Sequence, residues 1–346
     1  MIVLQWVVIP FLLLAVANYG VRHLVPTGPA WYEQAEINAR NQPDHMPDVI
    51  FIGSSRVAAA INNEAFDRRM SQLTGRKIVS LNFGQGYSTI QEHYLGMRNL
   101  LKRYSKPYKP FTVLIEAPGE MVNIKYYKRW TDDWINNGET QLLVPLLHVS
   151  DFLFFLKSST DKSNDKTYVA FKYLTKSIDL IRYRERTKAK IDRTFKNLLE
   201  PPAPKNIAPQ PDLTQRGGIK TDPKALEMIR ASAVTFANEM LSEQRDFQNW
   251  DQTVLADLIR LIESYNGTVV FYTMPASSVY SRVFNTNLHQ KNKATFKKQL
   301  KKWNIPLLYP EFSYTDEDFP DLWHMKLSRS FEFSEKLADA YFNVKR

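Results

Sequence analysis

Two short stretches of the chain combine residue types that suit nucleophilic catalysis. Gly53-Ser-Ser-Arg56 places a pair of serines after an apolar run, and Asp321-Leu-Trp-His324 places a carboxylate three residues before a histidine. A serine hydroxyl is a weak nucleophile at neutral pH unless a histidine takes its proton, and a carboxylate must fix the tautomer of that histidine. Asp321 and His324 can supply both groups from one short segment. The pattern therefore predicts a serine nucleophile that a histidine activates.

Simpler interpretations of the same residues remain open. Ser54 and Ser55 also suit a plain turn at the end of a strand, because Gly and Ser are common turn formers. For Arg56 a surface ion pair is the favoured role, with binding of an anionic group as the alternative. Glycines in Gly84-Gln-Gly86 would let backbone N–H groups approach an oxyanion, and Glu120 follows the third apolar run.

The elements that must position these residues form an alternating pattern. Short apolar runs bounded by Gly and Pro predict buried strands of a parallel sheet, and the longer segments between them predict helices. The predicted strands cover residues 49–52, 77–83, 111–116, 267–274 and 306–309. Helices are predicted over residues 88–104, 287–303 and 328–342, and a long helix or a helix pair over 223–265. Strands that alternate with helices indicate an α/β fold with helices on both faces of the sheet. The candidate groups follow strand ends, where such folds bind ligands.

The first residues of the chain predict a membrane anchor. Met1–Gly20 contains no charged side chain, and about 20 apolar residues span a bilayer as a helix. We therefore expect a transmembrane anchor over residues 1–24 and a polar stem over 25–47. A cleaved signal peptide is the alternative, because Ala15-Val-Ala17 resembles a small-x-small cleavage site.

Charge and composition limit the kinds of partner. Lys and Arg number 46 against 36 Asp and Glu, a net charge of +10, and the chain has no cysteine. The absence of cysteine excludes disulfides, thiolate metal sites and cysteine nucleophiles. Residues 151–225 hold 16 Lys and Arg against 9 Asp and Glu, so the positive charge is concentrated within a long insertion. The surplus favours an anionic partner such as membrane lipids or an acidic polymer. With no nucleic-acid-binding motif, we expect no nucleic acid partner.

The ordered motifs resemble those of the SGNH (GDSL-like) hydrolases. Gly53-Ser54-Ser55 takes the place of the family's Gly-Asp-Ser, Asn82–Ser88 is similar to its second block, and Asp321 and His324 match its last block. The resemblance implies a three-layer, flavodoxin-like parallel sheet, with a catalytic triad of Ser55, Asp321 and His324. It also implies that Ser55 and Gly86 form the oxyanion hole, and it leaves Ser54, Arg56 and Glu120 as candidate substrate-binding residues. The domains expected are a core of residues 48–122 and 262–346 and a helical, basic and aromatic insertion at 123–261.

The third block departs from the family pattern. Where the family has Gly-x-Asn-Asp, this chain has Pro118-Gly-Glu-Met121, so the asparagine of the oxyanion hole is missing. Glu120 in that place donates a hydrogen bond only when protonated. An esterase that lacks one oxyanion donor would lose about 10²–10³ in rate, so this departure weakens the interpretation as a plain esterase.

An anchor joined to such a domain resembles the extracytoplasmic proteins that work with membrane-bound O-acyltransferases (MBOAT family), among them the alginate O-acetylation and lipoteichoic acid D-alanylation proteins. The resemblance implies a periplasmic O-acyltransferase, with acetyl as the expected group, that acts on a cell-envelope polysaccharide. Its expected partners are an MBOAT-type protein as acyl donor, the glycopolymer as acceptor, and membrane lipids. No cofactor and no metal are expected. An SGNH-type glycan O-acetyl esterase and a non-catalytic assembly or glycan-binding subunit are the alternatives.

Overall fold

The structure is a computed structural model that describes residues 45–84, 90–104, 109–117, 251, 253–283, 285–319 and 324–345, together with Val16, Val149 and Ala231. The chain divides into two compact units, and every strand and helix considered below belongs to the unit formed by Gln34–Arg129 and Pro211–Arg346. Among the described residues no helix has the length and apolar character needed to cross a membrane. The expected anchor over residues 1–24 lies outside them except for Val16.

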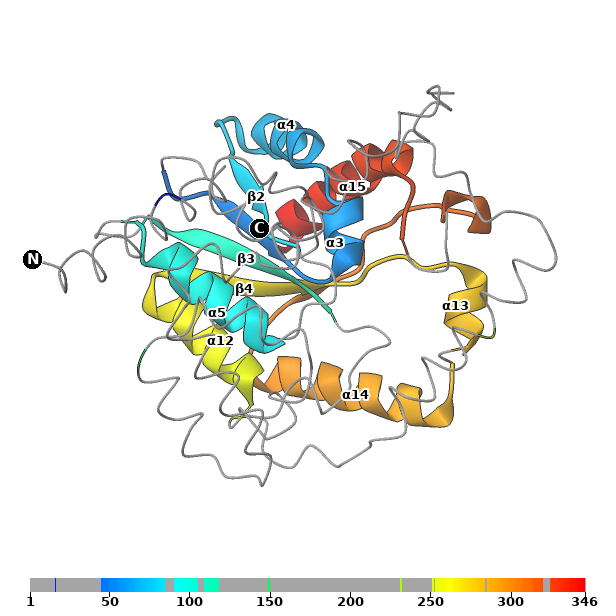
Figure 1. The fold of residues 1–346 in the computed structure, drawn as a ribbon. Coiled ribbons are helices and arrows are strands. Elements are labelled where there is room, and N and C mark those ends of the chain that lie inside the picture. The colour runs from blue at the N-terminus through cyan, green and yellow to red at the C-terminus, as the bar shows by residue number, and fades with distance from the viewer. Residues whose placement is uncertain are drawn as a thin grey trace, which may run out of the picture. The chain divides into compact units, whose positions relative to one another are not determined.

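A five-stranded parallel sheet forms the centre of this unit, in the order β2-β1-β3-β4-β5 (Figure 1). Ile50 of β1 pairs with Leu81 of β2 on one side and with Val113 of β3 on the other. The strands are β1 (Val49–Ile52), β2 (Ser80–Asn82), β3 (Phe111–Glu116), β4 (Gly267–Tyr272) and β5 (Leu307–Leu308). β1, β3 and β4 are mostly apolar because both faces of a parallel sheet are buried. The expected α/β class with an all-parallel sheet is confirmed.

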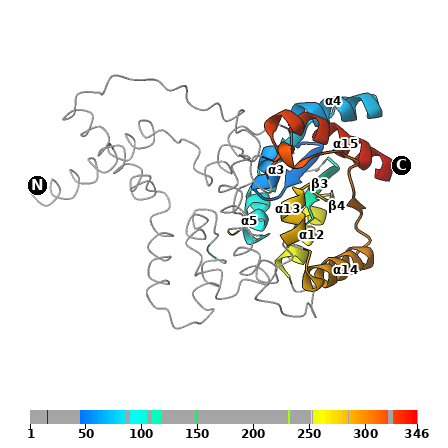
Figure 2. The same cartoon turned by 90° about the vertical axis from the view of Figure 1, so that its right-hand side faces the viewer.

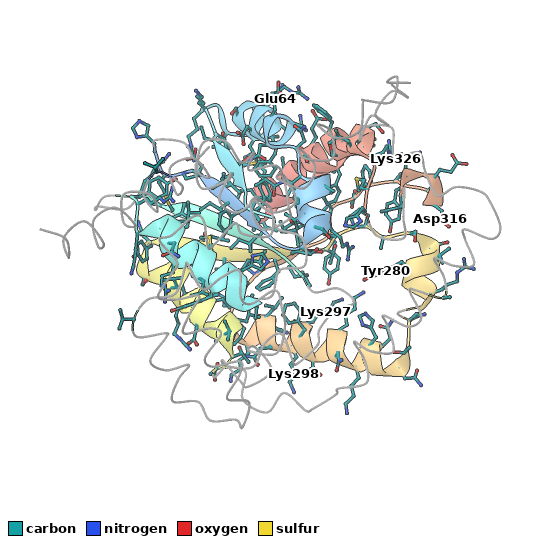
Figure 3. All side chains as sticks on the ribbon, in the orientation of Figure 1. Glu64, Tyr280, Lys297, Lys298, Asp316 and Lys326 are labelled. Carbon is teal, nitrogen blue, oxygen red and sulfur yellow. The ribbon has the colours of Figure 1, made fainter. Side chains whose placement is uncertain are left out.

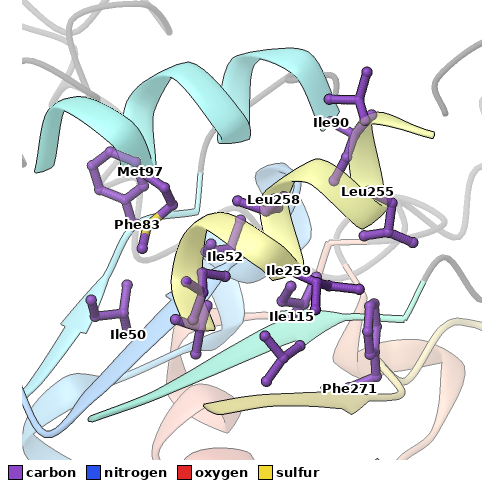
Figure 4. Packing of buried hydrophobic residues seen from close by; sticks show 14 of the residues in the cluster. Ile50, Ile52, Phe83, Ile90, Met97, Ile115, Leu255, Leu258, Ile259 and Phe271 are labelled. Atoms are coloured by element: carbon purple, nitrogen blue, oxygen red, sulfur yellow. The ribbon is translucent and has the colours of Figure 1, made fainter. Parts of the chain in front are cut away.

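Side chains that alternate along each strand build two separate cores. Ile50 and Ile52 lie in a cluster with α5 (Ile90–Leu101), α12 (Val254–Ser264) and α14 (Asn287–Lys302). Figure 4 shows its contacts with α5 and α12. Val49 and Phe51 point to the opposite face, where α3 (Ser55–Ala60), α4 (Asn63–Thr74) and α15 (Leu327–Lys345) cover the sheet. Figure 2 shows these two helical layers on either side of the strands. The arrangement is a three-layer α/β fold.

The sequence did not predict the two helices that follow β1. α4 begins after Asn62, whose side chain accepts a hydrogen bond from the N–H of Ala65, and ends at Gly75 in the left-handed conformation (φ 69°). Both are common capping residues of a helix. The sequence pattern of α4 is nevertheless weak, because most of its residues are polar and only one narrow face is apolar. The second predicted strand is also shorter than expected, since only Ser80–Asn82 pairs with β1.

The core also begins earlier on the return from the insertion than the expected boundary at residue 262. Thr253 caps α12 by accepting a hydrogen bond from the N–H of Ala256. Leu255, Leu258 and Ile259 of α12 pack into the same cluster as the sheet residues Ile52 and Ile115 (Figure 4). The residues that build the core therefore extend back to Thr253.

The strand order reverses at β1, which has β2 on one side and β3 on the other. Connections from neighbouring strands diverge at such a point, and open α/β sheets bind ligands there, beyond the carboxyl ends of the strands. Gly53 and Glu116 stand at this place, directly after β1 and at the end of β3.

Candidate active site

Ser55 is presented by a tight connection between β1 and α3. Ser54 is the N-cap of α3 and its hydroxyl accepts a hydrogen bond from the N–H of Arg56 at 3.2 Å, so Ser55 is the first residue of the helix. The serine pair is thus a strand-to-helix junction in which Ser54 stabilises the helix start and Ser55 remains available.

Gly53 makes this connection sterically feasible. A Cβ atom at Gly53 would lie 2.2 Å from Cγ2 of Val57 and 2.7 Å from Cβ of Glu116. Any other residue would push α3 away from the sheet and displace Ser55 with it.

His324 reaches Ser55 from the other end of the chain. Its Nε2 atom lies 2.7 Å from the Oγ atom of Ser55. This is hydrogen-bonding distance, and a histidine so placed can take the hydroxyl proton as the oxygen attacks a carbonyl carbon. The structure therefore brings together two of the residues that the sequence placed in the candidate triad.

The segment that carries His324 is held at both ends. Phe319 and Met325 are buried in the core on the α15 face of the sheet. The N–H of Lys326 donates to the carbonyl oxygen of Asp318 at 2.8 Å, and Nε of Arg329 lies 3.2 Å from the Asp318 carboxylate. These contacts hold Asp318 close to the residues that follow His324 and fix the backbone beside the imidazole.

A further contact ties the approach to this segment to α13 (Ser278–Val283). The carboxylate of Asp316 accepts two hydrogen bonds from Ser278, one from the N–H and one from the hydroxyl, both at 2.6 Å. Asp316 and Tyr280 are labelled in Figure 3, where Asp316 lies beside α13. The loop before His324 and the helix after β4 are therefore linked next to the site.

Glu116 is a site residue that the sequence analysis did not single out. Its Oε2 atom accepts a hydrogen bond from the N–H of Ser54 at 2.8 Å, and its Oε1 atom lies 3.6 Å from Nε of Arg56. The sequence held a clue to its role, because Glu116 is the only charged residue of the β3 sequence FTVLIE. Its importance depends on β3 being the direct neighbour of β1.

Arg56 does not form the surface ion pair that the sequence favoured. Its side chain is 4% exposed, and its Nη2 donates to the carbonyl oxygens of Met274 at 3.2 Å and Pro275 at 2.9 Å. The guanidinium carbon also lies 5.7 Å from the ring centre of Tyr280. The Glu116 carboxylate lies beside the buried guanidinium and carries the opposite charge. These contacts place Arg56 in the interior of the protein, where it connects the end of β3 to the residues after β4.

Tyr272, at the end of β4, is buried near Arg56 and Glu116. Burial raises the pKa of its phenol well above the ordinary value; the Glu116 charge raises it further, while the Arg56 charge opposes the shift. The hydroxyl has no hydrogen-bond partner among the described residues. Tyr272 therefore stays neutral and adds no charge of its own.

The end of β2 holds α3 from the other side. The side-chain amide of Asn82 donates to the carbonyl oxygens of Val57 at 3.2 Å and Ile61 at 3.0 Å, and its oxygen accepts from the N–H of Gly84. A Cβ atom at Gly84 would lie 2.5 Å from the backbone nitrogen of Ala58. Gly84 thus permits a close approach to α3.

Three predicted site residues, Asp321, Gly86 and Glu120, lie outside the described residues. No group of three His, Cys, Asp or Glu side chains that could hold a metal ion occurs within the described ranges. His93 and His289 are buried in the helical layers, and burial lowers the pKa of His93 to about 4.

Comparison with known proteins gives little beyond this geometry. No protein-family model matches the chain, and no curated protein matches it. Among solved structures, the chain is similar to a crystal structure from Bacteroides fragilis NCTC 9343 that is described provisionally as an acylhydrolase. The two share 12% sequence identity over 92% of this chain and 99% of the other, with a TM-score of 0.35. At that similarity the match carries no argument about function.

Proposed function

We propose that the protein is an O-acyltransferase that carries an acyl group, acetyl in the first instance, on Ser55 and passes it to a polysaccharide of the cell envelope. The observation that supports the chemistry is the 2.7 Å contact between Ser55 Oγ and His324 Nε2 at the carboxyl edge of the sheet. The resemblance to SGNH proteins that work with MBOAT partners supports the acceptor and the donor.

The proposed reaction has two balanced steps. Ser55 Oγ attacks the acyl carbonyl carbon while His324 takes the hydroxyl proton, and the departing donor oxygen receives that proton as its bond to the acyl carbon breaks. A sugar hydroxyl then attacks the acyl-serine, His324 takes its proton, and Ser55 regains a proton as the acyl group leaves. In this proposal Asp321 orients His324.

The negative oxygen formed in each step requires N–H donors. Ser55 stands at the first position of α3, where a backbone N–H has no acceptor within the helix, and no acceptor is found for it among the described residues. We assign this N–H, with that of Gly86, to the oxyanion hole. The N–H of Ser54 cannot take part, because Glu116 occupies it.

The proposed setting is the outer face of a membrane, with residues 1–24 as the anchor, lipids around it and an MBOAT-type protein supplying the acyl group. Protease digestion of intact cells and of permeabilised cells tests this placement. The proposal requires that the protease cleave the core domain while the inner membrane is intact, once the protease has passed any outer barrier. Protection until the inner membrane is opened would contradict it.

One experiment separates the transferase from its alternatives. The purified full-length protein is treated with a fluorophosphonate and, separately, with an aryl acetate in the presence and absence of a glycan acceptor. We expect mass spectrometry to locate the phosphonyl adduct on Ser55, and acetylation of the glycan to require Ser55. Release of acetate to water at a rate that the glycan does not change would indicate an esterase. A Ser55→Ala protein that still acetylates the glycan would overturn the proposal, and an unlabelled wild-type Ser55 would favour a non-catalytic subunit.

A further inference from the structure

We infer that Glu116 is a positioning residue for Ser55, acting through the two residues that flank it. This inference rests on the proposed function of Ser55. Glu116 binds the N–H of Ser54 at 2.8 Å and pairs with the side chain of Arg56 at 3.6 Å. The carboxylate therefore holds the residue before the nucleophile through its backbone and the residue after it through its charge.

The Glu116–Arg56 pair connects the ends of three strands. Ser54 and Arg56 follow β1, Glu116 ends β3, and the carbonyl oxygens of Met274 and Pro275 that bind Arg56 follow β4. The N–H of Ala117 also donates to the carbonyl oxygen of Tyr272 at 2.7 Å, which continues the pairing of β3 and β4 to the site. If only β1 held the start of α3, the helix would be free to tilt. These contacts fix its position on both sides of Ser55.

Electrostatics explains why a carboxylate at this place does not oppose the reaction. A lone negative charge near Ser55 would disfavour the oxyanion that forms there. The Arg56 guanidinium is always ionised and is enclosed with Glu116, so the pair is neutral overall. Glu116 also occupies the N–H of Ser54, which leaves the neighbouring N–H of Ser55 for the substrate oxygen.

The test compares Glu116 with a carboxylate in a matched setting at the other end of β1. Asp48 accepts a backbone N–H, from Val79 at 3.0 Å, and pairs with Arg76 and Lys109, yet it lies at the amino end of the strand. Glu116→Gln keeps an oxygen for the Ser54 N–H, and Glu116→Ala removes it. Because Glu116→Ala also removes the carboxylate beside the buried Arg56 guanidinium, Glu116→Gln combined with Arg56→Met provides a variant without either charge that is expected to fold.

The readout is the rate of phosphonate labelling at Ser55, separated into the maximal rate and the probe concentration that gives half of it. We expect Glu116→Ala to lower the maximal rate about 100-fold without changing the half-saturating concentration, and Glu116→Gln and the double variant to stay within about tenfold of the wild type. Asp48→Asn is expected to lower the thermal midpoint and leave the labelling rate of the folded protein unchanged. A folded Glu116→Ala protein that labels at the wild-type rate would overturn the inference.

A second measurement keeps this inference distinct from the proposed function. Amide hydrogen exchange of a peptide that contains Ser54–Val57 reports on the connection whether or not Ser55 reacts. We expect faster exchange there in Glu116→Ala than in Glu116→Gln. If wild-type Ser55 is not labelled, the proposed function fails, while unchanged exchange in Glu116→Ala would by itself refute the role of Glu116.

Discussion

The Ser55 hydroxyl and the His324 imidazole are 269 positions apart in the sequence and 2.7 Å apart in the structure. One follows the first strand of the sheet and the other immediately precedes its last helix. Their meeting depends on α15 packing against α3 and α4, so the candidate site exists only when the two ends of the α/β core are assembled.

Replacement of His324 should lower the reactivity of Ser55 without unfolding the protein. We expect His324→Gln to lower the rate of fluorophosphonate labelling of Ser55 by about 10²–10⁴, because general-base assistance contributes that much to serine reactivity. His45→Gln is the matched control, since His45 is exposed and lies in no described contact with the site. Equal labelling rates in the two variants would contradict the proposed role of His324.

The close approach at Gly53 should not tolerate a methyl group. The Cβ atom in Gly53→Ala would lie 2.2 Å from Val57 Cγ2, and overpacking of this kind costs about 1–3 kcal/mol of the free energy of unfolding. We expect that loss in urea denaturation, together with slower labelling of Ser55 in the folded protein.

Gly75 provides the control for this steric effect. It has φ 69° and nothing within 4 Å of an added Cβ. Asn tolerates this left-handed conformation, so Gly75→Asn should change the free energy of unfolding by less than about 1 kcal/mol and leave labelling intact. If Gly53→Ala behaved like Gly75→Asn, the proposed steric requirement would be wrong.

The link between Asp316 and Ser278 should support both stability and labelling. Asp316→Ala removes two hydrogen bonds to a carboxylate, and in this partly exposed setting we expect a loss of about 1 kcal/mol in the free energy of unfolding. Because the same contact steadies the approach to His324, the labelling rate should fall by roughly threefold to tenfold. Glu317→Ala changes the exposed neighbouring carboxylate and should alter neither quantity; equal effects of the two variants would show that the contact has no role.

His93 should make the stability of the fold depend on pH. Burial lowers its pKa to about 4, against 6.5 for an ordinary histidine, so between these values the unfolded chain binds more protons than the folded protein. The contribution is fully present above pH 6.5, and is lost as the pH falls toward 4, by an amount on the order of 3 kcal/mol. We expect His93→Gln to flatten the curve of unfolding free energy against pH in this window, measured by urea denaturation. An unchanged slope in the variant would assign the dependence to other groups.

The main elements of the core could be predicted from the sequence because each is encoded locally. The apolar runs at β1, β3 and β4 are bounded by Gly, Pro or charged residues, and the predicted range 111–116 is that of β3 itself. The short helix α3 and the polar helix α4 could not be found in the same way, since their stability comes from packing against α15 rather than from a strong apolar pattern.

The candidate site likewise contains residues that local sequence indicates and residues that only the tertiary structure reveals. Residue types and spacing pointed to the Ser54-Ser55 pair and to His324, and the resemblance to the SGNH hydrolases selected Ser55 as the nucleophile. The same reasoning placed Arg56 at the surface and passed over Glu116. A charge beside an apolar strand looks exposed until the neighbouring strands are known. The order β2-β1-β3-β4 places the ends of β3 and β4 against Arg56, and that order follows from long-range packing that no local pattern records.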